Sequence, residues 1–490
     1  MSSPSHRVVF VRDPEGFSAL EQPWNRLWSA AAAAEIFQHF SFAHAWVRAH
    51  AHSSQLLTAV VAGPEDDIHA ILPLAIQGGK LVFVGTGFSD YNDFLAEASE
   101  ATSHLRLILN ALLNEPGWSE CVFENIPGQS VLWAAFEQLR RSRHNLFKRI
   151  FVHSGTVPAP SLVPGPDGSE WQDAIRKESL RRHRRKLEKL GMVAFAHLTD
   201  AREIEQHLPL FMRQHAQRRG MAGDRSLFRG QDAVAFYREL IWSMDPAREL
   251  RFSTLTLDDR PIAYHLGFER CGKYIWYKPA FDVNFWDYSP GEVLLQSILM
   301  YAAGEGLREL DFTIGDEGFK SRFANVVRHN YTVSFFRQPG AAATARTRAI
   351  VAQAVHERPI LLSGARLAQR VIRTLKRDGI LSLATRMCRR VTQQFFKDDH
   401  VIVYRWPRAA FAASGPPQIE IQPLTLALIA ELAPDHEDVL NPGALRGFAR
   451  RLKARDRGFL GFRNNSLAHV AWLGIRDEIV AEYETGPDCR

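Results

Sequence analysis

The sequence predicts an α/β protein, more closely an α+β one, in which two similar units follow one another and mixed sheets are flanked by helices. Three observations predict this class. Short apolar stretches typical of strands alternate with longer stretches whose apolar residues recur at helical spacing. The alternation fills residues 7–340 and repeats its general order once. The chain of 490 residues is also long for one domain, since a domain holds roughly 150 residues.

Residues 1–156 form the first predicted unit. The turn at residues 63–67, Gly-Pro-Glu-Asp-Asp, lies between two strand-like stretches and so predicts an antiparallel pair. In chain order we expect strand 7–11, helices 17–34 and 37–50, strands 55–62, 68–76 and 80–85, helix 103–113 and strand 120–124.

A stretch rich in proline, glycine and serine follows at residues 157–169. It holds four prolines in thirteen residues. Because proline lacks a backbone N–H and fixes φ, we expect neither a helix interior nor a central strand here. The stretch is therefore predicted to be the linker between the two units.

The second predicted unit spans residues 170–340. Two hairpin turns are expected, at 258–261 and 271–272. In chain order we expect helix 175–190, strand 193–198, helices 204–219 and 231–243, strands 250–257, 262–270 and 273–281, helix 291–306, and strands 309–314 and 330–337. The two units show no residue-level repeat, so the tandem organisation follows from element order alone.

The start of the predicted helix at residue 291 has features of a phosphate site. Ser289 suits an N-cap, Pro290 the first helical position, and Glu292 a capping box. Free backbone N–H groups and the helix dipole favour an anion at such an end, and Gly291 lets a ligand approach. The same pattern also begins many helices that bind nothing, and Glu292 would repel a pyrophosphate.

Several runs of residues carry a resemblance to a known family. They are Arg260–Phe268, Tyr277–Asp282, Ser289–Leu295, Leu310–Lys320 with Phe323, the basic helix with Leu180, Arg184, Arg185, Leu187 and Gly191, and, in the first unit, Phe37–Trp46 and Gly87–Phe94. In order and spacing they resemble the BioF2-like (CelD/BcsL-type) acetyltransferases of the GNAT superfamily. The resemblance covers roughly residues 7–337.

The resemblance implies two tandem GNAT-like domains that use acetyl-CoA as the acyl donor. It also implies a relation to the Fem-type transferases, which use aminoacyl-tRNA on the same double fold. By this resemblance, residues 289–293 (Ser289, Pro290, Gly291, Glu292 and Val293) take the pyrophosphate position, and strand 262–268 runs beside the acyl-pantetheine arm.

The implied reaction is attack of a free amine on a thioester carbonyl. The enzyme must deprotonate and orient the amine and stabilise the oxyanion. The candidate bases are Asp311, His265 and Glu317, which lie at or just beyond strand ends, and Tyr264 or Tyr288 could protonate the leaving thiolate. His265 could equally be a core histidine.

Asp311 has a second interpretation, because it lies in an apolar strand where an unpaired carboxylate is costly. It is either functional or ion-paired, with Lys320 or Arg322 as the partner. The loop Ser89–Asp93 also has two interpretations, an acceptor-contacting loop or an ordinary Asx-rich turn. We expect the acceptor to be bound by Asp90, Tyr91 and Asn92 together with Lys320.

Two basic segments indicate which partners the protein could bind. The helix at 175–190 holds six Lys or Arg side chains from Arg181 to Lys189, which suit a solvated face, the 3′-phosphate of CoA, an acidic acceptor or RNA. No aromatic residue for base stacking lies between Trp171 and Phe195, so nucleic acid is not expected. The segment 341–415 is predicted to be helical and basic, and its part 341–400 suits packing on the preceding domain or an anionic membrane surface.

Residues 416–490 predict a partial third GNAT-like unit. Helices 423–433 and 442–455 and strands 458–463 and 466–475 resemble the opening of such a domain. No phosphate-binding segment follows before Arg490, so we expect no separate CoA site in this unit.

The four cysteines show no spacing of a disulfide framework or zinc site, and the histidines at 39, 44, 50 and 52 do not share one helix face. We therefore predict no metal and expect these histidines to lie mostly at the surface. Neither a signal peptide nor a membrane span of about 20 residues is evident, which predicts a cytoplasmic protein, with peripheral binding at the inner face of the membrane as a further expectation.

The predicted function is acyl-CoA-dependent N-acyl transfer, with acetyl-CoA as the donor and an amine on a sugar, lipid or peptide precursor of envelope or exopolysaccharide metabolism as the acceptor. The alternatives are a Fem-like transferase that uses aminoacyl-tRNA, and an interaction module without activity.

Overall fold

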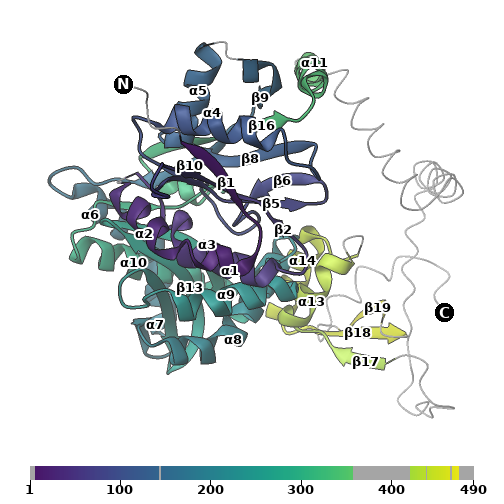
Figure 1. Cartoon of the computed structure of the whole chain (residues 1–490). Helices are drawn as coiled ribbons and strands as arrows, with labels where there is room; N and C mark the ends of the chain where they lie inside the picture. Colours follow the sequence, from purple (N-terminus) through teal and green to yellow (C-terminus); the bar gives the residue numbers. More distant parts are fainter. Residues whose placement is uncertain are drawn as a thin grey trace, which may run out of the picture. The chain divides into compact units, whose positions relative to one another are not determined.

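The computed structural model describes residues 6–31, 33–142, 145–356, 420–436, 439–463 and 466–473 (Figure 1). By their contacts, residues 1–342 and 419–490 form one compact body, which contains both predicted units, and residues 343–418 form a separate body. Of the predicted basic segment, only α11 (Pro339–His356) is described, and it is helical as expected. The remainder of that prediction, membrane contact included, lies outside the described residues.

The first predicted unit has the expected elements in the expected order, and β1 has its predicted bounds. The predicted helices 17–34 and 37–50 and the predicted strands 55–62 and 68–76 are each divided in two, and β7, α5, η2 and β9 were not predicted. The strands are β1 (Arg7–Val11), β2 (Gln55–Leu56), β3 (Thr58–Ala62), β4 (Ile68–Leu72), β5 (Leu74–Gln77), β6 (Lys80–Phe83), β7 (Leu95–Ala96), β8 (Glu120–Pro127) and β9 (Ile150–Val152). The helices are α1 (Pro14–Ser18), α2 (Glu21–Ala30), η1 (Ile36–Gln38), α3 (Phe40–His50), α4 (Ala101–Leu112), α5 (Val131–Arg141) and η2 (Asn145–Arg149).

The second predicted unit matches the expectation more closely, and α9, β12 and β14 have the predicted bounds. The strands are β10 (Val157–Leu162), β11 (Val193–Leu198), β12 (Leu250–Leu257), β13 (Arg260–Arg270), β14 (Lys273–Phe281), β15 (Glu309–Asp311) and β16 (Val326–Phe336). The helices are α6 (Ser169–Ile175), α7 (Glu178–Glu188), α8 (Ala201–Met221), η3 (Leu227–Arg229), α9 (Gln231–Ser243), η4 (Val283–Tyr288), α10 (Pro290–Gly304) and η5 (Lys320–Arg322).

One mixed sheet of twelve strands passes through both predicted units. Its order is β11-β12-β13-β14-β15-β10-β16-β8-β6-β5-β2, with β9 paired to β16. Near the end of the second unit, β16 pairs antiparallel with β8 of the first. A separate sheet has the order β1-β3-β4-β7. The α/β class with mixed sheets and flanking helices is confirmed, and the two units share their largest sheet.

The proline-rich stretch is partly a strand, which corrects the prediction that it contains none. β10 lies inside the large sheet, between β15 and β16. The carbonyls of Pro158 and Pro160 accept bonds from the N–H groups of Gly315 and Phe312, which follow the end of β15. The two prolines therefore face the chain beyond the end of β15, where no regular strand pairing requires their missing N–H groups. This position tolerates proline.

Helices cover the large sheet and enclose its cores. Figure 1 shows α4 and α5 beside the part of the sheet that holds β8, and α7 to α10 around the part that holds β13. One core joins α4 and α5 to β8 through Leu109, Phe123 and Phe136. Another lies under α10 and includes Leu294 and Ile298. The two predicted units therefore each contribute a core to one folded body.

The C-terminal segment forms β17 (Glu420–Pro423), α13 (Leu426–Leu432), η6 (Ala433–Asp435), α14 (Pro442–Lys453), β18 (Arg457–Arg463) and β19 (Ser466–Leu473). It packs on α8 through a core that joins Met221 to Leu424, Ile429 and Leu445. Asp435 forms ion pairs with Arg225 at 2.9 Å and Arg229 at 2.6 Å. The C-terminal segment is thus docked on the second predicted unit, residues 170–340.

Gly220 makes this docking possible and provides a test of it. A Cβ atom added at Gly220 would lie 1.8 Å from the carbonyl oxygen of Ala430 in α13. We expect Gly220→Ala to lower the free energy of unfolding by about 1–3 kcal/mol, because the added methyl overpacks the contact. Urea unfolding measures the change. Gly304→Ala, where no atom lies within 4 Å, is the control and is expected to be neutral or stabilising. Equal stability of the two variants would contradict the docking.

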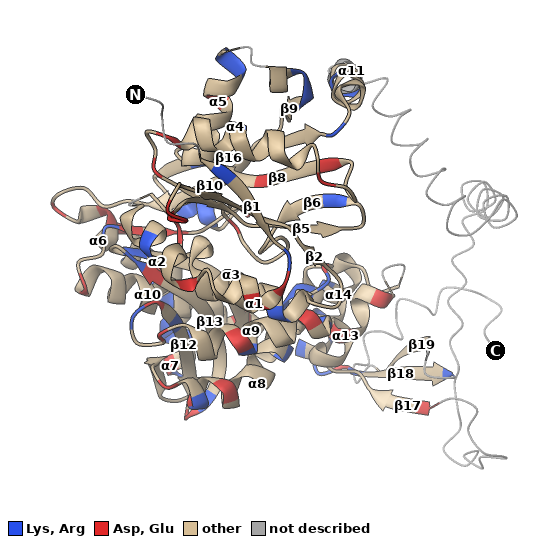
Figure 2. Cartoon of the chain, viewed as in Figure 1, with Lys and Arg blue, Asp and Glu red and all other residues tan. Residues whose placement is uncertain are grey.

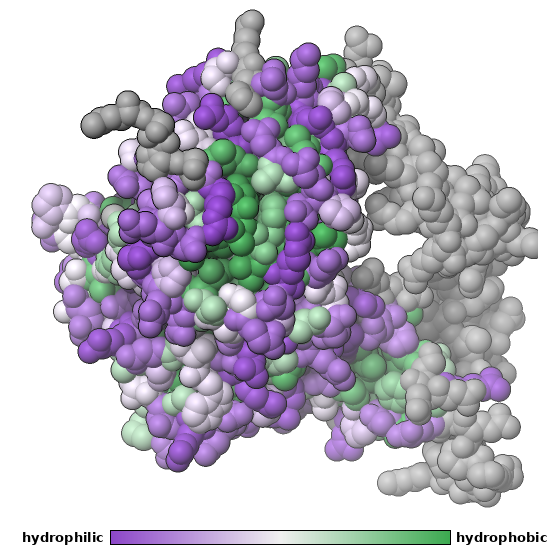
Figure 3. Space-filling view, viewed as in Figure 1, coloured by the Kyte–Doolittle hydropathy of each residue, from purple (hydrophilic) through white to green (hydrophobic). Residues whose placement is uncertain are grey.

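The surface of the described residues is mostly polar. Figure 2 shows positive and negative side chains interspersed over the elements rather than gathered in one field of a single sign. Figure 3 shows an apolar area on the face in view, in the part of the molecule where Figure 1 draws β1. No helix among the described residues is long and apolar enough to cross a bilayer.

Candidate active site

The candidate site lies where two neighbouring strands separate. β14 and β15 run parallel and pair only from Lys273 to Ile275 on β14. Beyond this point the chain after β15 bonds to β10 instead, while β14 continues to Phe281. Thr313, with φ of 56°, turns away from the ladder, although its hydroxyl donates to the carbonyl of Trp276 at 3.2 Å. The separation opens the sheet between the two strands.

A cavity of about 230 Å³ occupies this opening. Its walls come from the end of α8 and the chain after it, from β14, from the chain that follows β15 and from the first unit. The charged lining residues are Asp90, Arg218, Arg219, Arg225, Lys278, Glu317 and Lys320. Five cations and two carboxylates give the cavity a net positive charge, which suits an anionic ligand.

Lys278 and Arg218 are two partly buried cations that line this cavity. Burial lowers the pKa of Lys278, Asp90 opposes the shift, and Arg219 and Lys320 add to it. Burial and the charge of Arg219 lower the pKa of Arg218 to about 10, so Arg218 stays charged at neutral pH. Sequence reasoning missed both residues, although a lysine inside the apolar run of β14 was a usable signal, because a buried cation needs a partner.

Glu317 and Lys320 line the same cavity, Glu317 with an exposed side chain and Lys320 with a buried one. They are ion-paired at 2.8 Å. Burial acts to raise the pKa of Glu317, but the hydrogen bond and charge of Lys320 bring it below its usual range. Lys320 also donates to the carbonyl of Ile314 at 2.6 Å and so fixes the chain after β15. Of the three candidate bases, Glu317 is the one that lines the cavity.

His215 is a further lining residue that sequence reasoning missed. It lies on α8, and its Nδ1 is 2.9 Å from the hydroxyl of Ser226. Burial and the charges of Arg218 and Lys278 hold the pKa of His215 well below its usual range. The imidazole is therefore neutral at pH 7 and can exchange hydrogen bonds without adding charge.

The loop Ser89–Asp93 contributes one residue to the cavity and uses the others for structure. Asp90 lines the cavity, 4.0 Å from the amine of Lys278. Tyr91 is buried and donates to Asp311 at 2.7 Å, and Asn92 donates to the carbonyl of Glu124 at 3.0 Å. Asp90 is therefore placed where an acceptor-contacting residue would lie, whereas Tyr91 and Asn92 hold the loop in place.

Asp93, at the end of this loop, holds the start of α5. Its carboxylate accepts from the backbone N–H groups of Phe94 and Leu132, both at 2.9 Å, and of Val131 at 3.2 Å. Burial raises the pKa of Asp93 from 3.8 to about 7, against the lowering effect of these bonds. The folded protein therefore binds this proton more tightly than the unfolded chain.

This shift predicts a pH dependence of stability. Because the folded-state pKa is the higher one, Asp93 favours folding increasingly as pH falls from about 7 towards 3.8, and this contribution is lost as pH rises through about 7. We expect the stability of the wild type relative to Asp93→Asn to increase as pH falls across that window. Urea unfolding of both proteins at several pH values measures it, and a constant or decreasing difference would contradict the assignment.

Asp311 is ion-paired, with a different partner from the two that the sequence suggested. Its carboxylate lies 3.7 Å from the amine of Lys273, which also bonds to Glu35 at 2.9 and 3.1 Å. Tyr91 and the N–H of Thr313 donate to Asp311 as well. Burial raises the pKa of Asp311 to about 6, which Lys273 opposes. This network joins the first unit to β14 and β15 and does not line the cavity.

His265 and Tyr264 lie in the core of β13. His265 stacks on Trp276 with ring centroids 4.3 Å apart. Its Nδ1 is 3.2 Å from the hydroxyl of Tyr274, and its Nε2 accepts from the N–H of Tyr277 at 3.0 Å. The Tyr264 hydroxyl is 2.9 Å from Nδ1 of His207. Neither side chain lines the cavity, and both already have partners.

The N-terminus of α10 differs from the predicted capping box. Ser289 is in the left-handed region, with φ of 52°, and its side chain makes no capping bond. Glu292 instead contacts His183 at 3.0 Å and Arg322 at 2.8 Å, so its charge is neutralised. The N–H groups of Glu292 and Val293 already donate to the carbonyl of Ser289. A Cβ at Gly291 would lie 3.3 Å from the ring of Phe281.

Tyr288 lies at the end of η4, next to this helix start, and packs partly buried against the core under α10. Pro290 occupies the first position of α10, as predicted, and is buried. The predicted cofactor residues 289–293 thus form one turn at the far end of β14 from Lys273.

The basic helix α7 lies along α10. Arg184 donates to Gln296 at 2.9 Å and to Ser297 at 2.6 Å, and Arg181 and Arg185 both pair with Glu178. Much of the positive charge of this helix is therefore used for packing and local ion pairs.

The histidines near α3 have separate partners, and only His52 is exposed, which corrects the expectation of a mostly surface position. His50 is buried and stacks on Trp46 with centroids 4.5 Å apart. His39 lies 3.9 Å from Glu249, and burial lowers its pKa to about 4. His44 contacts Ser18 at 3.3 Å.

A larger cavity of about 960 Å³ lies between η4 and α14. It is lined by Met221, Asn284, Trp286, Asp287, Leu424, Thr425, Leu426, Gly443, Arg446, Ala449, Arg450, Leu452 and Lys453. Its residues come mainly from the C-terminal segment, and none of the predicted catalytic, cofactor or substrate residues is among them. We therefore assign the candidate active site to the smaller cavity.

Residues 175–321 match the family model of the acetyltransferase (GNAT) domain. The matched range includes β14, α10, β15 and all but Asp90 of the charged residues of the cavity. A comparison with curated proteins finds no significant match. The chain therefore contains a GNAT acetyltransferase domain, and the protein is an enzyme of the N-acyltransferase class. The narrower BioF2-like assignment stays a prediction.

Solved structures with a similar arrangement share little sequence with this chain. FemX is 9% identical with a TM-score of 0.45 over 64% of this chain and 96% of its own. The C-terminal domain of a putative lysylphosphatidylglycerol synthetase from Agrobacterium fabrum is 11% identical, with a TM-score of 0.43 over 68% and 96%. A tandem GNAT protein from the clavulanic acid biosynthesis pathway is 12% identical, with a TM-score of 0.39 over 68% and 99%.

Proposed function

We propose that the protein transfers an acyl group, in the first instance acetyl, from CoA to a primary amine, and that the reaction takes place in the cavity between β14 and β15. The observation that carries the proposal is the opening of the sheet at Ile275, inside the matched acetyltransferase domain, onto a cavity with an excess of cations. The thioester carbonyl oxygen becomes negatively charged during acyl transfer, and the cations of this cavity can stabilise that charge.

The donor is proposed to follow β14 from the cavity towards the start of α10. The phosphates would lie near the turn 289–293, where the charge of Arg322 already balances that of Glu292. The thioester would lie in the cavity, where Lys278 and Arg218 can stabilise negative charge that develops on the carbonyl oxygen. Such preorganised charge contributes most where water is excluded.

Glu317 is proposed as the general base. Its carboxylate is ionised at neutral pH, because its pKa is low, and it lines the cavity beside Lys320. It would take a proton from the amine as the nitrogen attacks the thioester carbonyl, and the carbon–sulfur bond then breaks to release CoA. Asp90, from the first unit, would attract the ammonium form of the acceptor, with Lys320 holding the wall in place. Tyr288 lies beside the turn 289–293 and does not line the cavity, so the proton that Glu317 takes from the amine is proposed to pass to the leaving thiolate.

Release of CoA in the presence of different amines tests this function. Acetyl-CoA is mixed with amino sugars, amino lipids and peptides that carry a free amine, and the free thiol is measured. We expect thiol release above the hydrolysis background with at least one class, together with an acetylated product in the mass spectrum. No release with any amine, combined with binding of charged tRNA that weakens steeply with salt, would favour the Fem-like alternative instead.

A further inference from the structure

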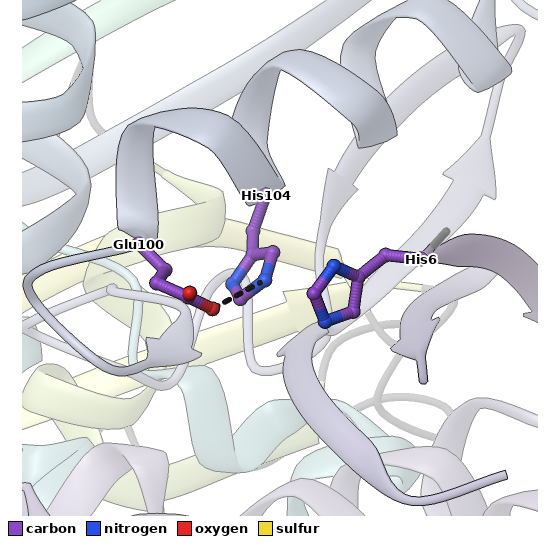
Figure 4. A group of neighbouring side chains, drawn as sticks. All are labelled: His6, Glu100 and His104. Carbon is purple, nitrogen blue, oxygen red and sulfur yellow. Dashed lines mark ion pairs between the residues drawn. The ribbon is translucent and has the colours of Figure 1, made fainter. Parts of the chain in front are cut away.

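A cluster of two histidines and one glutamate lies in the first unit, away from the residues that line the candidate active site. His6 precedes β1, Glu100 is the N-cap residue of α4, and His104 lies in the first turn of α4. One ligand atom from each side chain lies within 4.8 Å of the other two. Figure 4 shows the imidazoles of His6 and His104 side by side, with the Glu100 carboxylate next to His104.

We propose that this cluster binds a divalent transition-metal ion of the zinc type. Two imidazole nitrogens and one carboxylate oxygen form a donor set that zinc accepts, whereas calcium and magnesium prefer oxygen alone. The Glu100 carboxylate is 3.3 Å from Nε2 of His104. Two ligands at about 2.0–2.1 Å from one tetrahedral zinc ion are separated by a similar distance.

Other imidazole rings lie close to His104. The His104 side chain is buried, and its ring centroid lies 5.2 Å from that of His6 and 6.1 Å from that of His69. Imidazole nitrogen is a common zinc ligand, so rings gathered at this distance can share one cation.

His69 is the nearest additional imidazole. It is the second residue of β4, its ring centroid lies 4.7 Å from that of His6, and its Nε2 is 2.6 Å from the carboxylate of Asp67. Because Asp67 already engages this nitrogen, the proposed ligands are the three side chains of the cluster, with water completing the coordination.

The proposed role of the ion is structural. β1 is an edge strand, since it pairs only with β3 in the order β1-β3-β4-β7. An ion held by His6 and by two residues of α4 would fasten the start of β1 to that helix and close the loop between them. Sequence reasoning could not find the cluster, because His6 and His104 are far apart in the chain and Glu100 and His104 alone have the spacing of an ordinary helical ion pair.

The test uses the full chain without an affinity tag, freed of metal by a chelator. Zinc is titrated against a chromogenic competitor, and thermal unfolding is followed with and without zinc. We expect one equivalent bound and a higher melting temperature with zinc. Glu100→Gln and His6→Ala should weaken zinc by at least about 10-fold, since even an outer partner of a ligand contributes about 10- to 100-fold.

Two comparisons make the outcome decisive. Glu100 is half exposed, so Glu100→Gln should fold, and His52→Ala removes an exposed histidine outside the cluster and should leave zinc affinity unchanged. Zinc binding that is equal in the wild type, Glu100→Gln and His6→Ala would overturn the proposal. Acetyl-CoA binding is measured on the same metal-free protein and is expected to persist, so failure of the metal site and failure of the acyltransferase proposal are distinguishable.

Discussion

Replacement of Glu317 by glutamine is expected to lower kcat for acyl transfer by about 10²- to 10⁴-fold, the contribution usual for a positioned general base. The amide keeps the size of the side chain but cannot accept the proton of the amine. Affinity for acetyl-CoA is expected to stay the same, because Glu317 is proposed to act on the acceptor. Steady-state rates with the best amine, together with a donor titration, measure both quantities.

Asp316→Asn is the matched control for this prediction. Asp316 is the preceding residue, is exposed and does not line the cavity. Its replacement removes one negative charge from the same loop and should leave kcat unchanged. A similar loss in both variants would point to loop electrostatics, and an unchanged kcat in Glu317→Gln would remove Glu317 from the proposed mechanism.

The second large effect concerns stability. Lys273→Met is expected to lower the free energy of unfolding by about 3–5 kcal/mol, because it leaves Glu35 and Asp311 as buried carboxylates without their cation. Glu35 and Asp311 are both buried. Urea unfolding of the purified variant measures the loss.

Lys80→Met provides the control for this loss. Lys80 forms an ion pair of similar length with Glu120, 2.9 Å, but its side chain is 54% exposed. An exposed pair contributes about 0–1 kcal/mol. The two variants should therefore differ several-fold in their effect, and equal losses would contradict the structural role given to the buried network.

The order of elements could be predicted because it depends on local patterns. β12, β14 and α9 have alternating or helical spacing bounded by clear turns, and the structure confirms their bounds. β10 could not be predicted, because proline at 158 and 160 is locally unfavourable for a strand. Only the tertiary arrangement, with β15 ending beside those prolines, makes the strand possible.

In the candidate site, too, local patterns could be predicted and contacts made only by folding could not. Asp90 and Glu317 were predicted from their places just beyond predicted strands, and Lys320 as a possible partner of Asp311. The structure places all three beside one cavity, and their roles stay predictions. His215 and Arg218 were missed, since they lie on α8 and reach the cavity only through folding. The partner of Asp311 is Lys273, 38 positions earlier in the sequence, and no local pattern identifies such a pair.

The most direct test of the central claim is a calorimetric titration of acetyl-CoA into the wild type and into Lys278→Met. Lys278 lies between the two strands, where its amine is proposed to bind the thioester carbonyl oxygen of the donor both before and during transfer, and Lys186→Met on the outer basic helix serves as the control. We predict one site of micromolar affinity in the wild type and in Lys186→Met, weakened at least about 10-fold in Lys278→Met, which corresponds to about 1.4 kcal/mol. No binding to the wild type, or equal binding to all three proteins, would contradict the assignment of the cavity between β14 and β15 as the acyl-CoA site.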